Sequence, residues 1–167
     1  MSRVVVAWYS LSGYTESLAS ATVEALAGFD VERVEIVPTR AYSYFSAGVR
    51  GVTEAMSGKI IDLVSGVPAA DGLDGLVVFS PTWGWMSSPP VRSFVAGLPA
   101  GDGRPCVVGV THAGGPIGSF DRLAGLARES GYEVVEVLSV FCYSREQMQQ
   151  AAARAAAALS AALAEPG

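Results

Sequence analysis

One stretch near the start of the chain constrains the fold most. An apolar run, Val4–Tyr9, is rich in β-branched residues and ends abruptly in the turn Ser10-Leu11-Ser12-Gly13-Tyr14-Thr15. Leu18, Val23 and Leu26 then recur at roughly helical spacing, so we expect a strand, a tight polar turn and a helix in this order. Open α/β sheets build phosphate sites from this arrangement, because the start of a helix presents free N–H groups and the positive end of its dipole.

This turn supplies the first candidate ligand-binding residues, which are Ser10, Leu11, Ser12, Gly13, Tyr14 and Thr15. No Lys or Arg lies between Val4 and Glu32, so a phosphate here would be held by neutral donors and not by counter-charge. The turn lacks the three spaced glycines of a dinucleotide fingerprint, and Gly58-Lys59 is followed by Ile60, which excludes a Walker-type motif. The alternative is that Ser12 or Thr15 caps the helix with nothing bound.

Composition narrows the class of protein. The 167 residues are 50% hydrophobic with a mean hydropathy of +0.36. No apolar run approaches the ~18 residues that span a membrane, and Val4–Tyr9 is too short for a signal peptide. We therefore expect one cytoplasmic domain over residues 1–167, without membrane insertion. A net charge of −5 argues against nucleic acid as a partner and suits redox partners with basic docking faces.

The cysteines and the histidine offer little chemistry of their own. Cys106 and Cys142 each lie in an apolar run and form no Cys-x-x-Cys pair, so we expect two buried, reduced thiols. His112 is the only histidine, which argues against a zinc site.

Further apolar runs predict four more strands, over residues 31–37, 76–80, 106–110 and 134–141. Helices are expected after Pro89-Pro90, over 119–129 and over 145–164. From Thr39 to Ser65 the pattern is irregular, and we expect a long connection with a helix somewhere between Gly48 and Ser65. Such a connection is either a functional lid or a loop that its aromatic side chains pin to the core.

Five strands alternating with helices predict a three-layer α/β sandwich. Its doubly wound parallel sheet would have the order 2-1-3-4-5, with helices on both faces. The carboxyl ends of strands one, three and four then flank the switch point where ligands bind such sheets. The second and third candidate segments at these ends are Pro81, Thr82, Trp83, Gly84, Trp85 and Met86, and Thr111, His112, Ala113, Gly114 and Gly115.

Trp83 and Trp85 are unusual because they lie among Thr, Gly, Ser and Pro, where neither a strand nor a helix face would bury them. Tryptophan in such a position favours a flat ligand, since aromatic stacking adds about 0.5–1.5 kcal/mol beyond burial. The alternative is that one of the two simply covers the core.

Three motifs resemble those of the flavodoxin family and of FMN-dependent reductases. Ser-x-Ser-Gly-x-Thr is similar to the family's FMN-phosphate loop, and Pro-x-Trp-Gly followed by Pro-Pro-Val-Arg-x-Phe is similar to its second flavin loop. The Thr111 to Gly115 segment is similar to the third in position and glycine content. The chain departs from the family at Ala7, Trp8 and Thr22. The resemblance implies a flavodoxin-like fold of the short form, over nearly the whole chain, with FMN as cofactor.

The third segment bears on activity. Flavodoxins that act as carriers often place a second aromatic residue here to cover the outer flavin face, whereas this chain has Ala113 and Gly114. The resemblance therefore implies a face open to a nicotinamide or a quinone, unless Tyr14 or residues 42–45 cover it. We expect an oxidoreductase that uses NAD(P)H as co-substrate and reduces a quinone or a similar small acceptor. The alternative is an electron carrier between a reductase and a protein acceptor.

Roles for individual polar residues stay open at this point. His112 would hydrogen-bond the flavin or supply a proton near its ring, or else be a loop residue bonded to backbone. Arg40, Arg50 or Lys59 would meet dinucleotide phosphates, or else be solvated. The sequence is compatible with an oligomer.

Three other classes fit less well. A serine hydrolase triad can be drawn from Ser10 or Ser12 with His112 and Asp121, but the chain has no Gly-x-Ser-x-Gly elbow. A phosphorelay receiver needs an acidic cluster at its strand ends, where this chain has Tyr9-Ser10 and Ser80-Pro81. A domain used only for protein interaction is the third.

Overall fold

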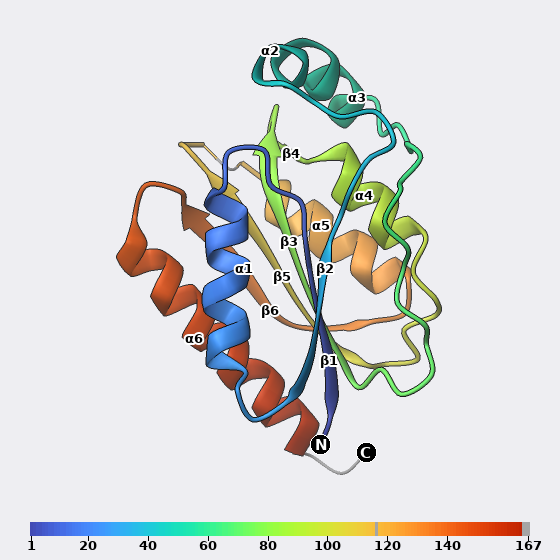
Figure 1. Ribbon diagram of the computed structural model, residues 1–167, viewed down its shortest axis with the longest axis vertical. Helices are drawn as coiled ribbons and strands as arrows, with labels where there is room; N and C mark the ends of the chain where they lie inside the picture. The colour runs from blue at the N-terminus through green and yellow to red at the C-terminus, as the bar shows by residue number, and fades with distance from the viewer. Residues whose placement is uncertain (116, 165–167) are drawn as a thin grey trace.

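Strands and helices alternate along the chain in the computed structural model, which describes residues 1–115 and 117–164 (Figure 1). The strands are β1 (Arg3–Trp8), β2 (Asp30–Glu35), β3 (Gly75–Trp83), β4 (Met86–Ser87), β5 (Pro105–His112) and β6 (Glu133–Phe141). The helices are α1 (Tyr14–Ala25), α2 (Tyr44–Ser46), the π-helical turn η1 (Ala47–Gly51), α3 (Val52–Met56), α4 (Pro89–Ala96), α5 (Ser119–Glu129) and α6 (Arg145–Ala164).

The long strands form a parallel sheet in the order β2-β1-β3-β5-β6, and this confirms the predicted order 2-1-3-4-5. The short strand β4 was not predicted and pairs antiparallel with the end of β3. In the register, Val6 of β1 lies between Arg33 of β2 and Val77 of β3.

Helices cover both faces of the sheet, with α1 and α6 on one side and α4 and α5 on the other (Figure 1). Side chains alternate along a strand, so Val4 and Val6 pack toward α1 and α6, while Val5 and Ala7 pack toward α4 and α5. Burial on both faces explains why the strands are nearly continuous apolar runs. Within the described residues, no helix is both long and apolar enough to cross a membrane.

Several predicted bounds are confirmed and one strand is corrected. Helices α5 and α6 cover the predicted 119–129 and 145–164. The second strand was expected to reach residue 37, but β2 ends at Glu35. Val37 instead turns to residues 64 and 65, because its N–H donates to Ser65 Oγ at 3.0 Å and its carbonyl accepts from Val64 N at 2.7 Å.

The helix expected between Gly48 and Ser65 is present, because α3 lies within these bounds, but helical structure also begins earlier in the chain. A helical run begins at Tyr44 and ends at Met56, through α2, η1 and α3. We call residues 44–56 the helical segment. Ser43 and Ser46 form a capping box that starts it, and Gly58 ends it in a left-handed conformation, with φ +73°.

Two strands are longer than predicted, so residues expected in loops belong to the sheet. β3 continues past Ser80 to Trp83 and turns through Gly84 and Trp85 into β4. Both turn residues have positive φ, 55° and 63°, the pattern of a type I′ hairpin turn. Similarly, β5 extends to His112.

Candidate functional site

The turn after β1 leaves the start of α1 without a side-chain cap. Gly13 occupies the N-cap position with φ 89°, and its own N–H donates to Ser10 Oγ at 3.0 Å. The prediction that Ser12 or Thr15 would cap the helix is therefore wrong. Because nothing caps it, the first turn of α1 keeps N–H groups that can bind an anion.

A buried hydroxyl pair joins the first candidate segment to the third. The Oγ1 atoms of Thr15 and Thr111 are 2.7 Å apart, and both side chains are buried. The bond fixes the start of α1 against the carboxyl end of β5, so these two segments share one site.

Trp83 is held by two tyrosines at the end of β3. Its ring meets those of Tyr9 and Tyr42 edge to face, with centroids 5.6 and 4.9 Å away. Burial raises the pKa of Tyr9 to about 12 and raises the pKa of Tyr42 as well, so both phenols are neutral at physiological pH. This aromatic cluster joins three parts of the chain, because Trp83 ends β3, Tyr9 follows β1 and Tyr42 precedes the helical segment.

The helical segment packs tightly on this hairpin through two glycines. A Cβ built on Gly51 would lie 2.8 Å from the Trp83 ring, and one on Gly84 would lie 2.7 Å from Val52 Cγ1. Single π-helical turns such as η1 are frequent at functional sites.

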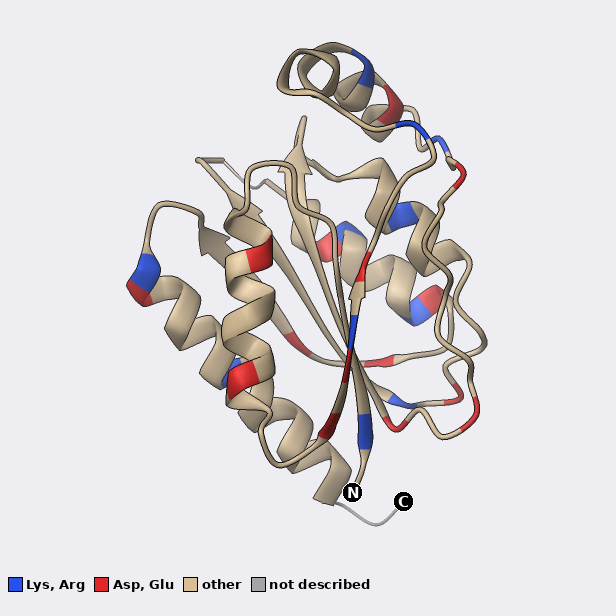
Figure 2. Cartoon of the chain, viewed as in Figure 1, with Lys and Arg blue, Asp and Glu red and all other residues tan. Residues whose placement is uncertain are grey.

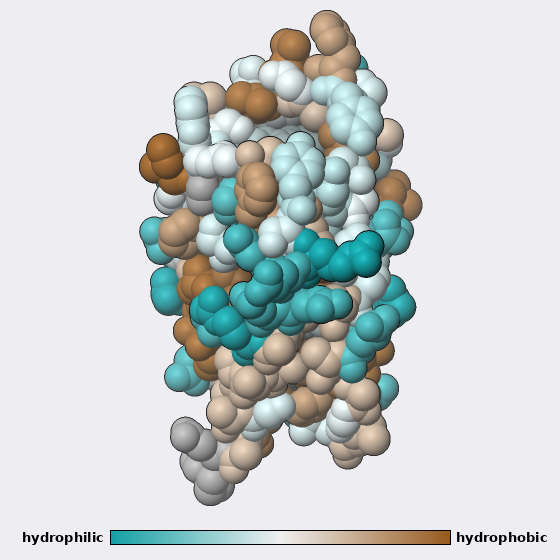
Figure 3. All heavy atoms as spheres, turned by 90° about the vertical axis from the view of Figure 1, so that its left-hand side faces the viewer, coloured by the Kyte–Doolittle hydropathy of each residue, from teal (hydrophilic) through white to brown (hydrophobic). Residues whose placement is uncertain are grey.

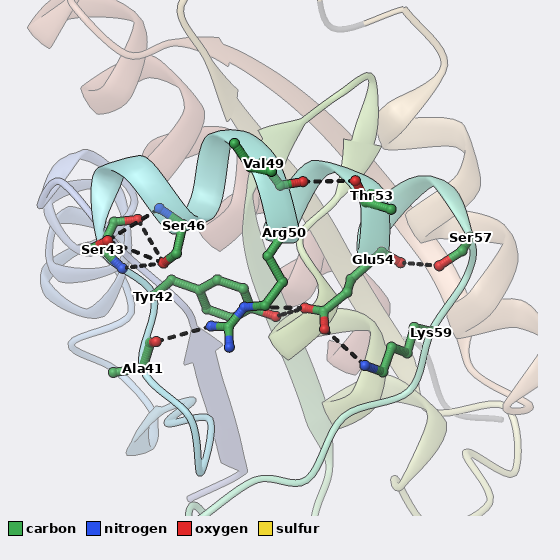
Figure 4. Close-up of polar contacts among 10 residues, drawn as sticks. All are labelled: Ala41, Tyr42, Ser43, Ser46, Val49, Arg50, Thr53, Glu54, Ser57 and Lys59. Carbon is green, nitrogen blue, oxygen red and sulfur yellow. Dashed lines mark hydrogen bonds and ion pairs between the residues drawn. The ribbon is translucent and has the colours of Figure 1, made fainter.

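A polar cluster ties the same segment to the chain before and after it (Figure 4). Glu54 accepts hydrogen bonds from the Tyr42 hydroxyl at 2.5 Å and from Lys59 Nζ at 2.9 Å. Arg50 lies over the Tyr42 ring, 4.4 Å from its centroid, and donates to Ala41 O at 3.0 Å. Burial alone would raise the pKa of Glu54, but these two donors and the charges of Lys59 and Arg50 lower it below its ordinary value.

His112 ends β5 with an unused nitrogen. Its backbone carbonyl accepts from Cys142 N at 2.8 Å, while Nδ1 is buried and has no hydrogen-bond partner among the residues that the structure describes. Burial lowers the pKa of His112, so the imidazole is neutral at pH 7 and can offer one donor and one acceptor.

These elements surround a cavity of about 540 Å³, here called the main cavity. Its lining comes from the α1 turn, the helical segment, the β3–β4 hairpin and the ends of β5 and β6, and none of it is charged at neutral pH. The lining residues are Leu11, Ser12, Tyr14, Thr15, Tyr44, Ala47, Gly48, Val52, Pro81, Thr82, Trp83, Gly84, Thr111, His112, Ala113, Cys142 and Tyr143.

The cavity brings together most, but not all, of the predicted site residues. Predicted residues outside its lining are Ser10, Gly13, Trp85, Met86, Gly114 and Gly115. Trp85 and Met86 instead line a separate cavity on the outer side of the hairpin. Tyr44 lies in the segment 42–45, which the sequence analysis considered as a cover for the site. Lining residues that the sequence analysis did not include are Ala47, Gly48, Val52, Cys142 and Tyr143. Cys142 and Tyr143 are the first two residues after β6, so extending the strand-end rule to the fifth strand would have found them.

Exposed apolar side chains surround the opening of the main cavity. Tyr44 is 72% exposed, Phe45 83% and Tyr143 63%. Figure 3 views the molecule from the side of α6, and above a hydrophilic band its upper end shows mostly pale side chains with scattered hydrophobic patches. Tyr44 and Tyr143, which both line the cavity, therefore remain largely open to solvent.

The rival chemistries find no support in this geometry. In the part of the chain that the structure describes, Asp121 makes no hydrogen bond or ion pair, and Ser10 accepts a backbone N–H, so no Ser–His–Asp relay is present. Nor do the described residues include a group of acidic, histidine and cysteine side chains that could hold a metal ion, as a receiver domain requires.

Comparison with solved structures relates the whole arrangement to known proteins, although no protein-family model and no curated protein matches the sequence. A flavoprotein of Lactobacillus acidophilus, solved with FMN, is 15% identical over 83% of this chain and 93% of its own, with a TM-score of 0.67. A flavodoxin from the Archaea is 16% identical over 98% and 99%, with a TM-score of 0.66. An oxidoreductase of Corynebacterium diphtheriae is 17% identical over 100% and 99%, with a TM-score of 0.64.

Proposed function

Because the chain has a flavodoxin-like fold, we propose that it binds FMN in the main cavity and works as an oxidoreductase. The single observation that carries this proposal is the convergence of the α1 turn, the β3–β4 hairpin and the end of β5 on that cavity. A volume of about 540 Å³ lies within the range of roughly 300–1,000 Å³ that small-molecule sites occupy. The similar flavoprotein of Lactobacillus acidophilus was solved with FMN.

The residues at the α1 turn fit a phosphate. The helix start is uncapped, and Ser12 and Thr15 line the cavity beside it. No lining residue carries a positive charge, so backbone N–H groups and hydroxyls would hold the phosphate.

The other end of the cavity fits a flat ring with polar edges. Trp83 offers an aromatic surface that Tyr9 and Tyr42 hold in place, and His112 has a buried Nδ1 without a partner. When bound, FMN supplies the electron-transfer chemistry. The chain's own part is to orient the ring through Trp83, to hydrogen-bond its edge through His112 and to limit access to water through the helical segment.

We further propose that NAD(P)H reduces the bound flavin directly and that a quinone or a similar small acceptor oxidises it. Ala113 lines the cavity without covering it, and Tyr44 and Tyr143 are mostly exposed, which leaves room for a second ring. Tyr143 also favours a second candidate, an electron carrier, because its ring lines the cavity and would cover the outer flavin face if it turned inward.

Two titrations test the cofactor. FMN is expected to bind more tightly than riboflavin, and Ser12→Ala is expected to weaken FMN while leaving riboflavin nearly unchanged. Equal affinities for the two flavins would overturn the assignment of the phosphate to the α1 turn.

Anaerobic reduction separates enzyme from carrier. If the protein is an enzyme, NADPH or NADH bleaches the bound flavin without any added reductase, and Ala113→Tyr blocks turnover while FMN stays bound. A flavin that stays oxidised for many minutes with NAD(P)H, yet is reduced when a flavodoxin reductase is added, would establish the carrier instead.

A further inference from the structure

A second cavity of about 570 Å³ lies on the outer side of the β3–β4 hairpin, and we call it the outer cavity. It is lined by Met56, Gly84, Trp85, Met86, Ile117 and Arg122. Gly84 lines both cavities, so a ligand in the outer cavity would lie next to the main one. Among the described residues that line the outer cavity, Arg122 alone is charged, and the other side chains are apolar.

Trp85 stands in an unusual conformation at the edge of this cavity. Its φ is 63°, a backbone conformation that residues other than glycine rarely adopt, and its side chain is 55% exposed. Arg122 Nη1 donates to the Trp85 carbonyl at 3.3 Å and also contacts the Met86 sulfur. The backbone of Trp85 is therefore in a conformation that costs free energy, and this conformation holds a large aromatic ring near a guanidinium at the surface. Residues in such strained conformations cluster at functional sites.

A second arginine lies close by and is unpaired. Arg92 of α4 is only 6% exposed, yet in the described part of the chain its side chain makes no hydrogen bond or ion pair, and its Nη1 is buried. That atom lies near Gly58, 3.8 Å from where a Cβ would lie, and Gly58 follows Met56 of the cavity lining by two residues. Burial, and then the like charge of Arg122, lower the pKa of Arg92.

Within residues 1–115 and 117–164, no acidic residue pairs with either arginine. The ion pairs among the described residues include neither Arg92 nor Arg122, and Asp121, next to Arg122 in the chain, pairs with neither. Arg92 lies in α4 and Arg122 in α5, and these helices contact each other. Figure 2 shows basic positions on both helices and acidic positions on α5. A buried charge without a partner is costly, and a neighbouring like charge adds to that cost, so an anion from outside is what this arrangement lacks.

We propose that the outer cavity binds a small aromatic anion. The Trp85 ring would stack on the aromatic part, the exposed Arg122 would pair with a phosphate or carboxylate, and Arg92 would add its charge from behind the wall. Two sources share this chemistry: the adenylate half of a nicotinamide dinucleotide, and an aromatic carboxylate that serves as acceptor. These two roles rest on the proposed function, whereas binding of the anion itself does not require FMN.

Calorimetric titration of the full chain with adenosine monophosphate, salicylate and neutral adenosine tests the proposal. At least one of the two anions is expected to bind at one site, and adenosine to bind much more weakly. Arg122→Gln should weaken the anion about tenfold or more, as loss of a charge-assisted hydrogen bond does. Arg128→Gln is the matched control, because Arg128 is an exposed arginine on the same helix.

Arg92→Met adds a readout that a purely structural arginine would not give. It should weaken the anion several-fold and at the same time raise the melting temperature, because it removes an unpaired buried charge. If Arg92 is instead structural, the melting temperature falls and the anion affinity stays the same, which contradicts its part in the site.

The outcomes separate the two sources and the two proposals. Binding of adenosine monophosphate alone identifies a nucleotide, and binding of salicylate alone identifies a carboxylate. The outer site would be overturned if neither anion shows saturable binding. It would also be overturned if Arg122→Gln leaves the anion affinity unchanged, and that result would place the anion at the α1 turn. FMN titration of Arg122→Gln, expected to match the unmodified chain, reports on the main cavity independently.

Discussion

Gly51 carries the sharpest prediction, because it lies where the helical segment packs against Trp83. A Cβ at this position would be 2.8 Å from two ring carbons of Trp83 and 3.4 Å from Tyr42 Cε1. Carbon atoms in good contact lie about 3.5–4.0 Å apart, so Gly51→Ala must move the segment or the ring by about 0.7–1.2 Å. The Trp83 ring cannot easily yield, because Tyr9 and Tyr42 flank it.

The cost can be separated from the helical preference of alanine. Overpacking of this kind costs about 1–3 kcal/mol, whereas replacing glycine by alanine in a helix gains about 0.5–1 kcal/mol. Gly48→Ala has the same gain in the same π-helical turn, and a Cβ there would meet nothing within 4 Å. The difference between the two variants therefore isolates the contact with Trp83.

Native-state hydrogen exchange measures that difference. The Ser57 N–H, which donates to Thr53 O at 3.0 Å, reports opening of the segment. A loss of 1–3 kcal/mol corresponds to about 5- to 150-fold faster exchange in Gly51→Ala than in Gly48→Ala. Equal exchange rates in the two variants would refute the packing argument, and with it the idea that Trp83 positions the helical segment.

Three further substitutions test the polar cluster around Glu54, the aromatic ring of Trp83 and the Thr15–Thr111 hydroxyl pair. Glu54→Gln should destabilise the chain by about 1–3 kcal/mol at neutral pH, because it replaces the carboxylate that receives two hydrogen bonds. The pKa of Glu54 lies below its ordinary 4.5, so the stability that its charge contributes is present above pH 4.5 and is lost as the pH falls through the lowered pKa. The melting temperatures of Glu54→Gln and of the unmodified chain should therefore converge as the pH falls through that range. Trp83→Leu should weaken the binding of FMN by about 2- to 12-fold, because about 0.5–1.5 kcal/mol of stacking energy is lost, and it should raise the fluorescence of the bound flavin. Trp85→Ala should leave both the affinity and the fluorescence unchanged. Thr15→Val should cost about 1–3 kcal/mol in denaturant unfolding, because it strands the buried Thr111 hydroxyl.

Each of these has an outcome that contradicts it. A Glu54→Gln protein whose loss of stability does not shrink as the pH falls below 4.5 would show that shape, and not charge, accounts for the effect. If Trp85→Ala changes the flavin emission and Trp83→Leu does not, the wrong tryptophan has been assigned to the ring. The double change of Thr15 and Thr111 to Val should cost less than the sum of the single changes, and additive costs would argue against a direct bond.

The sequence predicted the sheet well because its signals there were local. A β-branched run that ends in a polar turn marks β1 and α1, and the helices over 119–129 and 145–164 follow from their periodicity. The strand order follows from alternation of strands and helices. None of these inferences needed a contact between residues distant in the sequence.

The site was predicted less completely because it depends on such contacts. Trp83 was expected in a loop, but Tyr9 and Tyr42, from two other parts of the chain, hold it in an extended strand. The placement of the helical segment over the cavity depends on close approaches at Gly51 and Gly84, which composition does not reveal. Trp85 adopts a left-handed conformation that sequence preferences disfavour, so its position on the outer side of the hairpin could not be anticipated.

The absence of charge from the lining of the main cavity has a consequence for ionic strength. A phosphate held there by neutral donors has no counter-charge for salt to screen, while the chain as a whole carries a net charge of −5 and repels it. Added salt should therefore tighten FMN binding slightly and speed its association. The outer cavity should respond in the opposite way, because the attraction between an anion and Arg122 weakens as the screening length falls. Titrations at low and high salt would thus distinguish the two cavities without any substitution.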